Sequence, residues 1–380
     1  MVLPPTSLYY IRKLVTRLQI VNVEELSEDM VVADDVYSKS GQLILRKNSK
    51  LTRQMISHLA YYHVTSIPIT VGELSEATKY NIAHKKEVEQ NHINKLLDSP
   101  EYRNFRKKYL NNIEIIEKEF NDIILKNAPI NEQAFIHDTL ELFQDNQTTY
   151  SLFGMLHTMK QIDDSTYAHS MNVAIISRLI GIWLDLPKQD LDNLTLAGLL
   201  HDIGKCQIPD EILLKPGKLT KPEFDFIKKH PEFGYSIVSS QEIDPRIKRA
   251  VLLHHERFDG SGYPFGYKGD QLKQFEAIIS IADVYDAMTS NRCYRSALCP
   301  FEVIAQFEYE GLHKYHALYI LTFLERIAES YLNSDVLLSD NSIGRIVYIN
   351  KRLTRPIVQL DNQKFINLEE NPDIYIEAII

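Results

Sequence analysis

Histidine and aspartate side chains recur through the middle of the sequence with the types and spacing that metal chemistry requires. They occur in the segments STYAHSMN, LAGLLHDIGK, KKHPEF, VLLHHERFDGSGYP and ISIADVYD. Imidazole and carboxylate groups together are ligands used by manganese, iron and zinc. Seven such groups exceed what one ion needs, and one carboxylate can bridge two ions, so we predict a centre of two divalent metals. Its expected ligands are His169, His201, Asp202, His230, His254, His255 and Asp283.

A pair of metals would make this centre suited to phosphodiester hydrolysis. Two metals that share a water lower its pKa and stabilise the attacking and leaving oxygens of a phosphoryl displacement. Lys205, one turn after His201, is placed to neutralise charge that builds on a phosphate oxygen. Arg292 and Arg295 form an i, i+3 pair suited to a compact dianionic ligand. Lys205 could instead complement the end of its helix, and the arginines could form surface ion pairs.

The apolar spacing predicts a helix around the first histidine. His169, Val173, Ile176 and Ile180 fall at i, i+4, i+7 and i+11, so they share one helical face. That face carries the imidazole toward the core together with the apolar side chains. A single histidine on such a stripe is more often an ordinary core residue than a ligand, so His169 alone decides little.

The adjacent pair His201-Asp202 ends an apolar helical run that begins near Leu194. We expect Gly204 to terminate that helix and to leave both side chains at its carboxyl end. A buried carboxylate is costly unless it has a partner or binds a metal. The pair therefore favours a metal site over an apolar core.

The remaining expected ligands also lie at helix ends or in apolar runs. His230 precedes Pro231, which suits the first position of a helix. His254 and His255 end an amphipathic helix, about 100° apart around its axis. Asp283 closes an apolar run, where a carboxylate is hard to explain as core. We expect these helices to converge in the core of a bundle, as in other metal-binding bundles.

The composition indicates a folded, acidic protein. The chain has 380 residues, a length that is enough for two or three domains. Its composition, 44% hydrophobic and 24% charged residues, is ordinary for a globular protein. A net charge of -9 argues against binding to DNA or RNA polymers, because such proteins neutralise several phosphates. The cysteines Cys206, Cys293 and Cys299 form no CxxC pair, so we expect neither a disulfide framework nor a zinc knuckle. Basic residues interrupt the first 21 positions, and no segment reaches about 18 uninterrupted apolar residues. We therefore expect a cytoplasmic protein without a membrane span.

The pattern of apolar, charged and β-branched residues changes three times along the chain, which predicts a multidomain protein. Residues 1–76 are expected to form a small α/β module, with strand, turn, strand, helix and strand between residues 31 and 70. Residues 77–145 read as a charged helical connector that could form a homodimer. Residues 146–334 are expected to form an all-α bundle that carries the active site. Residues 335–380 contain short β-rich runs and are expected to form a C-terminal β appendage.

Residues 150 to about 325 resemble an HD-GYP domain, a group of HD-superfamily phosphohydrolases whose best-known members hydrolyse cyclic di-GMP. The resemblance implies an all-α fold, metal binding by the seven residues named above, and phosphate contact by Lys205. It also implies that Arg292 and Arg295 meet the phosphates or guanine, and that Gly262-Tyr263-Pro264 shapes the substrate-side loop. Tyr263 is thus a candidate substrate-binding residue. The matching motifs are HDIGK (201–205), HP (230–231), HHERFDGSGYP (254–264) and DVYDAMTSNRCYR (283–295).

The sequence departs from the family pattern at two positions. Some members use a glutamate four residues before the first histidine for a third metal, but Ser165 stands there, so we expect two metals. Cys293 stands where the usual pattern has a proline, which alters the stiffness of the loop but leaves the arginine charges. Asp259 and Asp286 could orient metal-bound imidazoles or could be ordinary turn and helix residues.

We therefore expect a phosphodiesterase in which a metal-bridging hydroxide opens cyclic di-GMP to linear pGpG, with further cleavage to GMP left open. Asp202 and Lys205 are the expected catalytic residues, and iron or manganese the expected metals. One rival is a phosphodiesterase for another cyclic or linear dinucleotide. Another is a non-catalytic cyclic di-GMP receptor, although a receptor has no physical need for seven metal ligands. Asp202→Ala should abolish turnover by an enzyme but leave a receptor's response intact.

Overall fold

The computed structural model describes most of the chain, and the part it describes falls into two compact units. We call them the N-terminal unit, up to His84, and the main unit, from Lys85 onward. Among the described residues, no helix is both long and apolar enough to cross a membrane. The described residues are 17–23, 26–27, 30–37, 43–52, 55–56, 59, 64, 66–71, 99–144, 152–153, 155–156, 159, 165–215, 219–290, 298–310 and 312–380.

The described residues of the N-terminal unit form two small antiparallel sheets. β2 (Val36–Tyr37) pairs with β3 (Leu43–Leu45), which confirms the predicted hairpin, although its turn lies outside the described residues. The predicted last strand is β4 (Ser66–Val71). Its partner is β1 (Arg17–Asn22), a strand that we did not predict. Alternation of Leu18 and Ile20 with polar residues was the available signal.

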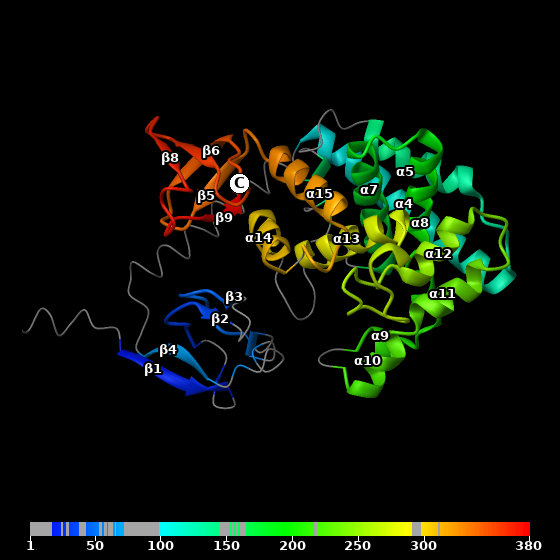
Figure 1. Cartoon of the computed structure of the whole chain (residues 1–380), viewed down its shortest axis with the longest axis horizontal. Helices are drawn as coiled ribbons and strands as arrows, with labels where there is room; N and C mark the ends of the chain where they lie inside the picture. The colour runs from blue at the N-terminus through cyan, green and yellow to red at the C-terminus, as the bar shows by residue number, and fades with distance from the viewer. Residues whose placement is uncertain are drawn as a thin grey trace, which may run out of the picture. The chain divides into compact units, whose positions relative to one another are not determined.

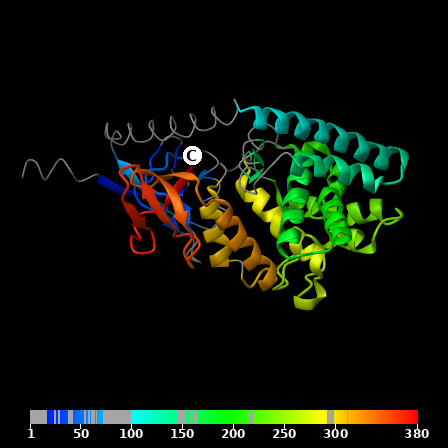
Figure 2. The same ribbon diagram turned by 90° about the horizontal axis from the view of Figure 1, so that it is seen from above.

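The main unit is predominantly helical, as predicted (Figure 1). Figure 2 shows α4 lying along one side of the bundle. Within its described residues, the α-helices are α4 (Pro100–Lys126), α5 (Glu132–Gln144), α7 (Thr166–Trp183), α8 (Lys188–Leu200), α9 (Asp210–Leu213), α10 (Lys221–Ile227), α11 (His230–Val238), α12 (Pro245–Leu253), α13 (Gln274–Thr289), α14 (Pro300–Glu310) and α15 (Ala317–Ser330). Short 3-10 helices are η2 (Ile203–Gln207) and η3 (Gly269–Gln271).

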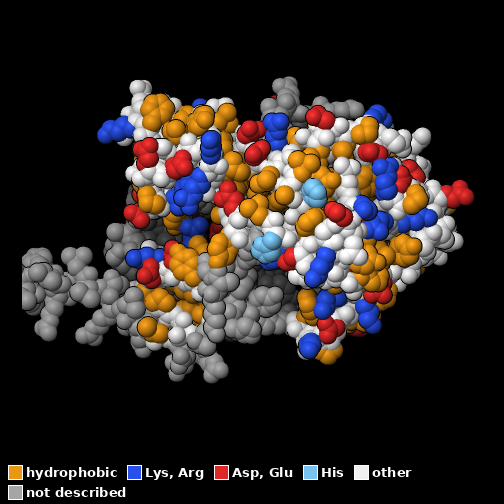
Figure 3. Space-filling model, viewed as in Figure 1, with side chains coloured by type: hydrophobic (Ala, Val, Ile, Leu, Met, Phe, Trp, Pro, Cys, Tyr) orange, Lys and Arg blue, Asp and Glu red, His pale blue; other side chains and the backbone are white. Residues whose placement is uncertain are grey.

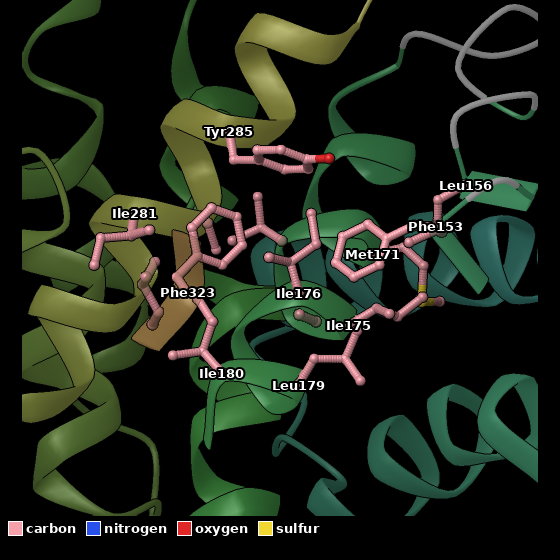
Figure 4. Close-up of a cluster of buried hydrophobic side chains, with 14 of the residues drawn as sticks. Phe153, Leu156, Met171, Ile175, Ile176, Leu179, Ile180, Ile281, Tyr285 and Phe323 are labelled. Atoms are coloured by element: carbon pink, nitrogen blue, oxygen red, sulfur yellow. The ribbon is translucent and has the colours of Figure 1, made fainter. Parts of the chain in front are cut away.

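Helix α7 runs through the core of the bundle. Its buried apolar side chains pack among aromatic rings from other helices, as Figure 4 shows for Tyr285 of α13 and Phe323 of α15. These two rings meet edge to face at 5.1 Å between centroids. The buried guanidinium of Arg178 is paired with Asp192 of α8 at 2.9 Å, so it is not left uncompensated. A helix held on several sides in this way is a rigid support for His169 in its first turn.

A five-stranded antiparallel sheet completes the main unit, in the order β8-β7-β6-β5-β9. Four strands match the predicted β-rich runs, whereas β5 was not predicted. Side chains of the sheet, among them Val336 and Ile346, belong to the same hydrophobic cluster as Phe323 of α15. The sheet therefore shares its core with the bundle. The strands are β5 (Asp335–Leu338), β6 (Ile343–Tyr348), β7 (Ile357–Leu360), β8 (Phe365–Asn367) and β9 (Ile376–Ile379).

The surface of the main unit carries charges of both signs. On the face in Figure 3, lysine and arginine side chains are interspersed with aspartate and glutamate over the helices. This mixture accords with the net charge of -9. The domain boundaries expected at residues 76, 145 and 334 stay predictions.

Candidate metal centre

The bundle brings all seven expected ligands together from five stretches of chain. Two lie inside helices, His169 in the first turn of α7 and Asp283 in α13. The others lie at helix ends. His201 and Asp202 follow α8, His230 begins α11 as predicted, and His254 and His255 follow α12.

Asp202 lies at the centre of the group, and its side chain is 1% exposed. Its Oδ2 lies 3.4 Å from Nε2 of His169 and 3.3 Å from Nε2 of His201. Its Oδ1 lies 3.2 Å from Nε2 of His230 and 3.8 Å from Nε2 of His254. Two clusters thus share Asp202, and in each the candidate ligand atoms lie within 4.8 Å of one another. The first contains His169, His201 and Asp202, and the second contains Asp202, His230, His254 and His255.

Hydrogen bonds fix the orientation of three of these histidine rings. Nδ1 of His201, His230 and His254 lies 2.7, 2.7 and 2.9 Å from the backbone carbonyl oxygen three residues earlier. A carbonyl oxygen only accepts hydrogen bonds, so each Nδ1 must carry the proton and donate it. In the neutral ring the lone pair is then on Nε2. Three lone pairs therefore point toward Asp202.

Several of these atoms lack the partners that buried polar atoms require. Nε2 of His230 and Nε2 of His254 face each other at 3.2 Å, so two lone pairs oppose one another. Nε2 of His201 and Oδ1 of Asp202 are buried and make no hydrogen bond within the described part of the chain. Buried polar atoms are ordinarily satisfied, and exceptions need an explanation. Divalent cations fit this donor set, since imidazole nitrogen and carboxylate oxygen are their usual ligands.

His169 is oriented by a carboxylate instead of a carbonyl. Its Nδ1 lies 2.7 Å from Oδ2 of Asp286, and its Nε2 lies 3.1 Å from Oδ1 of Asp283. Burial lowers the pKa of His169, but the two carboxylates outweigh burial and raise that pKa to about 9. Of the two roles left open for Asp286, the structure favours contact with an expected ligand. The i, i+3 spacing of the two aspartates on one helix was the sequence signal.

The other ionisable groups favour charged carboxylates and neutral imidazoles. Burial raises the pKa of Asp202, but Lys205 and His201 outweigh it and hold that pKa well below its usual range. Contacts with His169 and His255 likewise outweigh burial and lower the pKa of Asp283.

The pKa values of two neighbouring histidines are also lowered, which keeps these rings neutral. Burial and adjacent histidines hold the pKa of His254 and that of His255 well below the usual range. Metal ligands need these same protonation states, ionised carboxylate and neutral imidazole.

Two glycines permit the close packing that brings the ligands together. A Cβ at Gly198 would lie 2.6 Å from Cα of Ala174. The observed close packing of α7 against α8 therefore requires a residue without a Cβ at this position. A Cβ at Gly204 would lie 2.0 Å from the carbonyl oxygen of His230. The prediction that Gly204 ends the helix is wrong, because α8 already ends at Leu200 and Gly204 lies within η2. Its role is close contact with α11.

Lys205 and Tyr263 lie beside the centre. Nζ of Lys205 lies 2.5 Å from Oδ2 of Asp202. The Tyr263 ring stacks on the His255 ring, with 4.6 Å between centroids. Arg292 and Arg295 lie outside the described residues.

Two further side chains, those of Ser165 and Asp259, form hydrogen bonds with nearby backbone groups. Oγ of Ser165 caps α7 by accepting a hydrogen bond from the backbone N–H of Ala168. Asp259 is a turn residue, because its Oδ1 accepts hydrogen bonds from the backbone N–H and hydroxyl of Ser261.

Comparison with known proteins agrees with these motifs. The model of the family described as "HD domain" matches residues 138–317. A cyclic di-GMP phosphodiesterase of Pseudomonas aeruginosa is 40% identical over 155 residues, which cover 40% of this chain and 37% of that protein. The cyclic di-GMP phosphodiesterase response regulator RpfG of Xanthomonas campestris is 36% identical over 168 residues, which cover 44% of each chain.

A relative whose name gives a substrate other than cyclic di-GMP also matches this chain. The 3'3'-cGAMP-specific phosphodiesterase 3 of Vibrio cholerae is 37% identical over 148 residues, which cover 39% of this chain and 32% of that protein. The chain thus spans less than half the length of each of these three relatives. The segment matched by the family model includes the helices that carry the histidine and aspartate motifs. Residues 138–317 of this chain form an HD domain, and its motifs identify it as a member of the HD-GYP group.

Proposed function

We propose that the main unit is a metal-dependent phosphodiesterase that hydrolyses cyclic di-GMP to linear pGpG. The observation that carries this proposal is the pair of clusters that share Asp202, with buried nitrogen lone pairs directed at its carboxylate. Relatives that are named as phosphodiesterases for cyclic di-GMP and for cGAMP support the substrate class.

Two divalent ions, for which we propose iron or manganese, would be held by the two clusters. Asp202 would be common to both, and Asp283 lies beside His169 of one cluster and His255 of the other. When bound, such a pair lowers the pKa of a water and neutralises charge on the phosphoryl oxygens.

The chain's own residues would orient and stabilise the reacting phosphate. Lys205 is the nearest cation to Asp202 among the described residues, and its side chain is 20% exposed, so its ammonium can reach a phosphate that enters from solvent. Its charge would stabilise the negative charge that develops on the phosphoryl oxygens. We propose that Tyr263 contacts the substrate from above His255, and that Arg292 and Arg295 bind its phosphates or guanine.

The proposal is tested by identifying products chromatographically after incubation of the protein, loaded in turn with manganese and ferrous iron, with cyclic di-GMP. We expect pGpG from the wild type and none from Asp202→Ala. A parallel incubation with 3'3'-cGAMP and with linear diguanylate decides between the three nucleotides. If cyclic di-GMP binds but neither metal supports turnover, the receptor alternative replaces the proposed function.

A further inference from the structure

A buried glutamate, Glu256, holds the loop that follows the histidine pair. Its side chain is 1% exposed. Oε1 of Glu256 accepts hydrogen bonds from the backbone N–H groups of Phe265, at 2.6 Å, and Gly266, at 3.1 Å. Oε2 accepts one from the N–H of Tyr267, at 3.0 Å. The carboxylate therefore fixes three consecutive backbone groups of residues 260–267, which we call the 260–267 loop.

Only a carboxylate can make this set of contacts. Backbone N–H groups that converge on one point form a site for an anion, and the Glu256 carboxylate fills it. A glutamine has one acceptor oxygen and one NH2 group, so one side of the amide would face an N–H donor. Burying a charge is costly unless it is fully satisfied. A loop that needed only to be packed could be held by apolar side chains at lower cost.

The 260–267 loop lies directly on the metal centre. The backbone N–H of Tyr263 donates to the carbonyl oxygen of His255 at 3.3 Å, and the two rings stack. Gly262 allows this approach, since a Cβ there would lie 2.4 Å from the same carbonyl oxygen. The loop also presents Phe265, whose side chain is exposed and stacks on Tyr267. Glu256 thus links the backbone next to His255 to the aromatic residues of the loop.

We propose that Glu256 is a positioning residue that fixes the 260–267 loop so that Tyr263 forms a rigid wall of the substrate site. This inference rests on the proposed function for the identity of the substrate. In this role Glu256 would act through the backbone of the loop and not on the reacting atoms. Its loss should weaken substrate binding more than it slows the chemical step.

The test compares Glu256→Gln with Glu276→Gln in the full chain. Glu276 is a similarly buried glutamate that accepts a hydrogen bond from the N–H of Lys273 and pairs with Arg249, two partners outside residues 260–267. For each variant we would measure steady-state kinetics with cyclic di-GMP, metal content, and hydrogen exchange of the amides in residues 265–267. Glu256→Asp is made as well, because it keeps the charge but withdraws it by one methylene group.

We expect Glu256→Gln to raise KM at least fivefold, to change kcat less than threefold, and to accelerate exchange in the loop at least tenfold with metal content unchanged. Glu276→Gln should leave KM and loop exchange at wild-type values. Equal rises of KM in both variants, or unchanged loop exchange in Glu256→Gln, overturn the inference. If Glu256→Gln does not fold, Glu256→Asp is held to the same comparison.

A wild-type protein that hydrolyses no cyclic dinucleotide overturns the proposed function alone. The role of Glu256 in fixing the loop is then decided by the exchange difference between the Glu256 and Glu276 variants, which needs no substrate.

Discussion

The protons on the histidine rings determine what the centre can bind. Backbone carbonyl groups hold the proton of His201, His230 and His254 on Nδ1, so Nε2 is free to bind a cation. His169 differs, because Asp286 and Asp283 flank both of its nitrogens. In the metal-free protein this ring binds a proton that a cation must displace.

We expect metal binding to release a proton from His169. Its pKa of about 9 means that the ring is protonated at about pH 7.5, and a ligand nitrogen must be deprotonated. Metal affinity should therefore rise with pH up to about 9. Calorimetric titration with Mn²⁺ in buffers of different ionisation enthalpy measures the number of protons released. His169→Gln should release about one proton fewer than the wild type, whereas the exposed control His313→Gln should match it. Equal release from all three proteins would contradict this account.

Asp286→Asn tests the orientation of His169. The amide keeps a hydrogen-bond acceptor for Nδ1 but removes the negative charge that makes the ring a better ligand. We expect metal affinity to fall about 10- to 100-fold, as is typical when such a partner of a ligand is altered. Activity should recover partly at high metal concentration. An unchanged Mn²⁺ dissociation constant would show that Asp286 is only a helix residue.

Among the structural elements, the contacts of α7 with α8 and of η2 with α11 place the ligands. Both contacts depend on a missing side chain, Gly198 in the first and Gly204 in the second. His169 is carried by α7, whereas His201 and Asp202 follow α8. A change in the separation of these helices therefore changes the geometry of the centre.

Gly198→Ala should destabilise the protein and weaken metal binding. The added methyl group would meet the α7 backbone at Ala174, and overpacking of this kind costs about 1–3 kcal/mol. Gly181→Ala is the matched control, because its methyl group meets only the flexible ends of leucine side chains. Its effect should stay within about 1 kcal/mol. Denaturant unfolding and metal content measure both, and equal stability of the two variants would contradict the packing argument.

The helical character of the main unit could be predicted because apolar periodicity continues through most of it. Two short strands, β1 and β5, were not predicted. The role of Gly204 was missed because it depends on α11, which is distant in sequence. Glu256 gave no signal, because its partners are backbone groups that every residue possesses. The contacts of Gly204 and Glu256 could therefore not be predicted, because they form only in the tertiary structure.

For the whole molecule, the shared core makes the C-terminal sheet part of the main unit. Val336, Leu338, Ile346 and Val358 are fully buried in the cluster that also contains the bundle residues. Each buried apolar side chain of this size stabilises a fold by about 1.5–3 kcal/mol. The sum is comparable with the entire stability of a typical domain, about 5–15 kcal/mol.

A chain that ends at Ser334 should therefore lose cooperative unfolding. The control is a chain that begins at Lys85, which keeps the whole main unit and should retain its unfolding transition. Calorimetry and near-ultraviolet circular dichroism measure both proteins. A cooperative transition and full metal content in the chain without residues 335–380 would show that the sheet is an independent appendage.

Anomalous diffraction from crystals of the manganese-loaded protein would test most directly the claim that two clusters sharing Asp202 form one metal centre. The account predicts two anomalous peaks, one among His169, His201 and Asp202, and the other among Asp202, His230, His254 and His255. Crystals of Asp202→Ala should lose occupancy at both positions. A single peak, or peaks away from Asp202 in the wild type, would contradict the account.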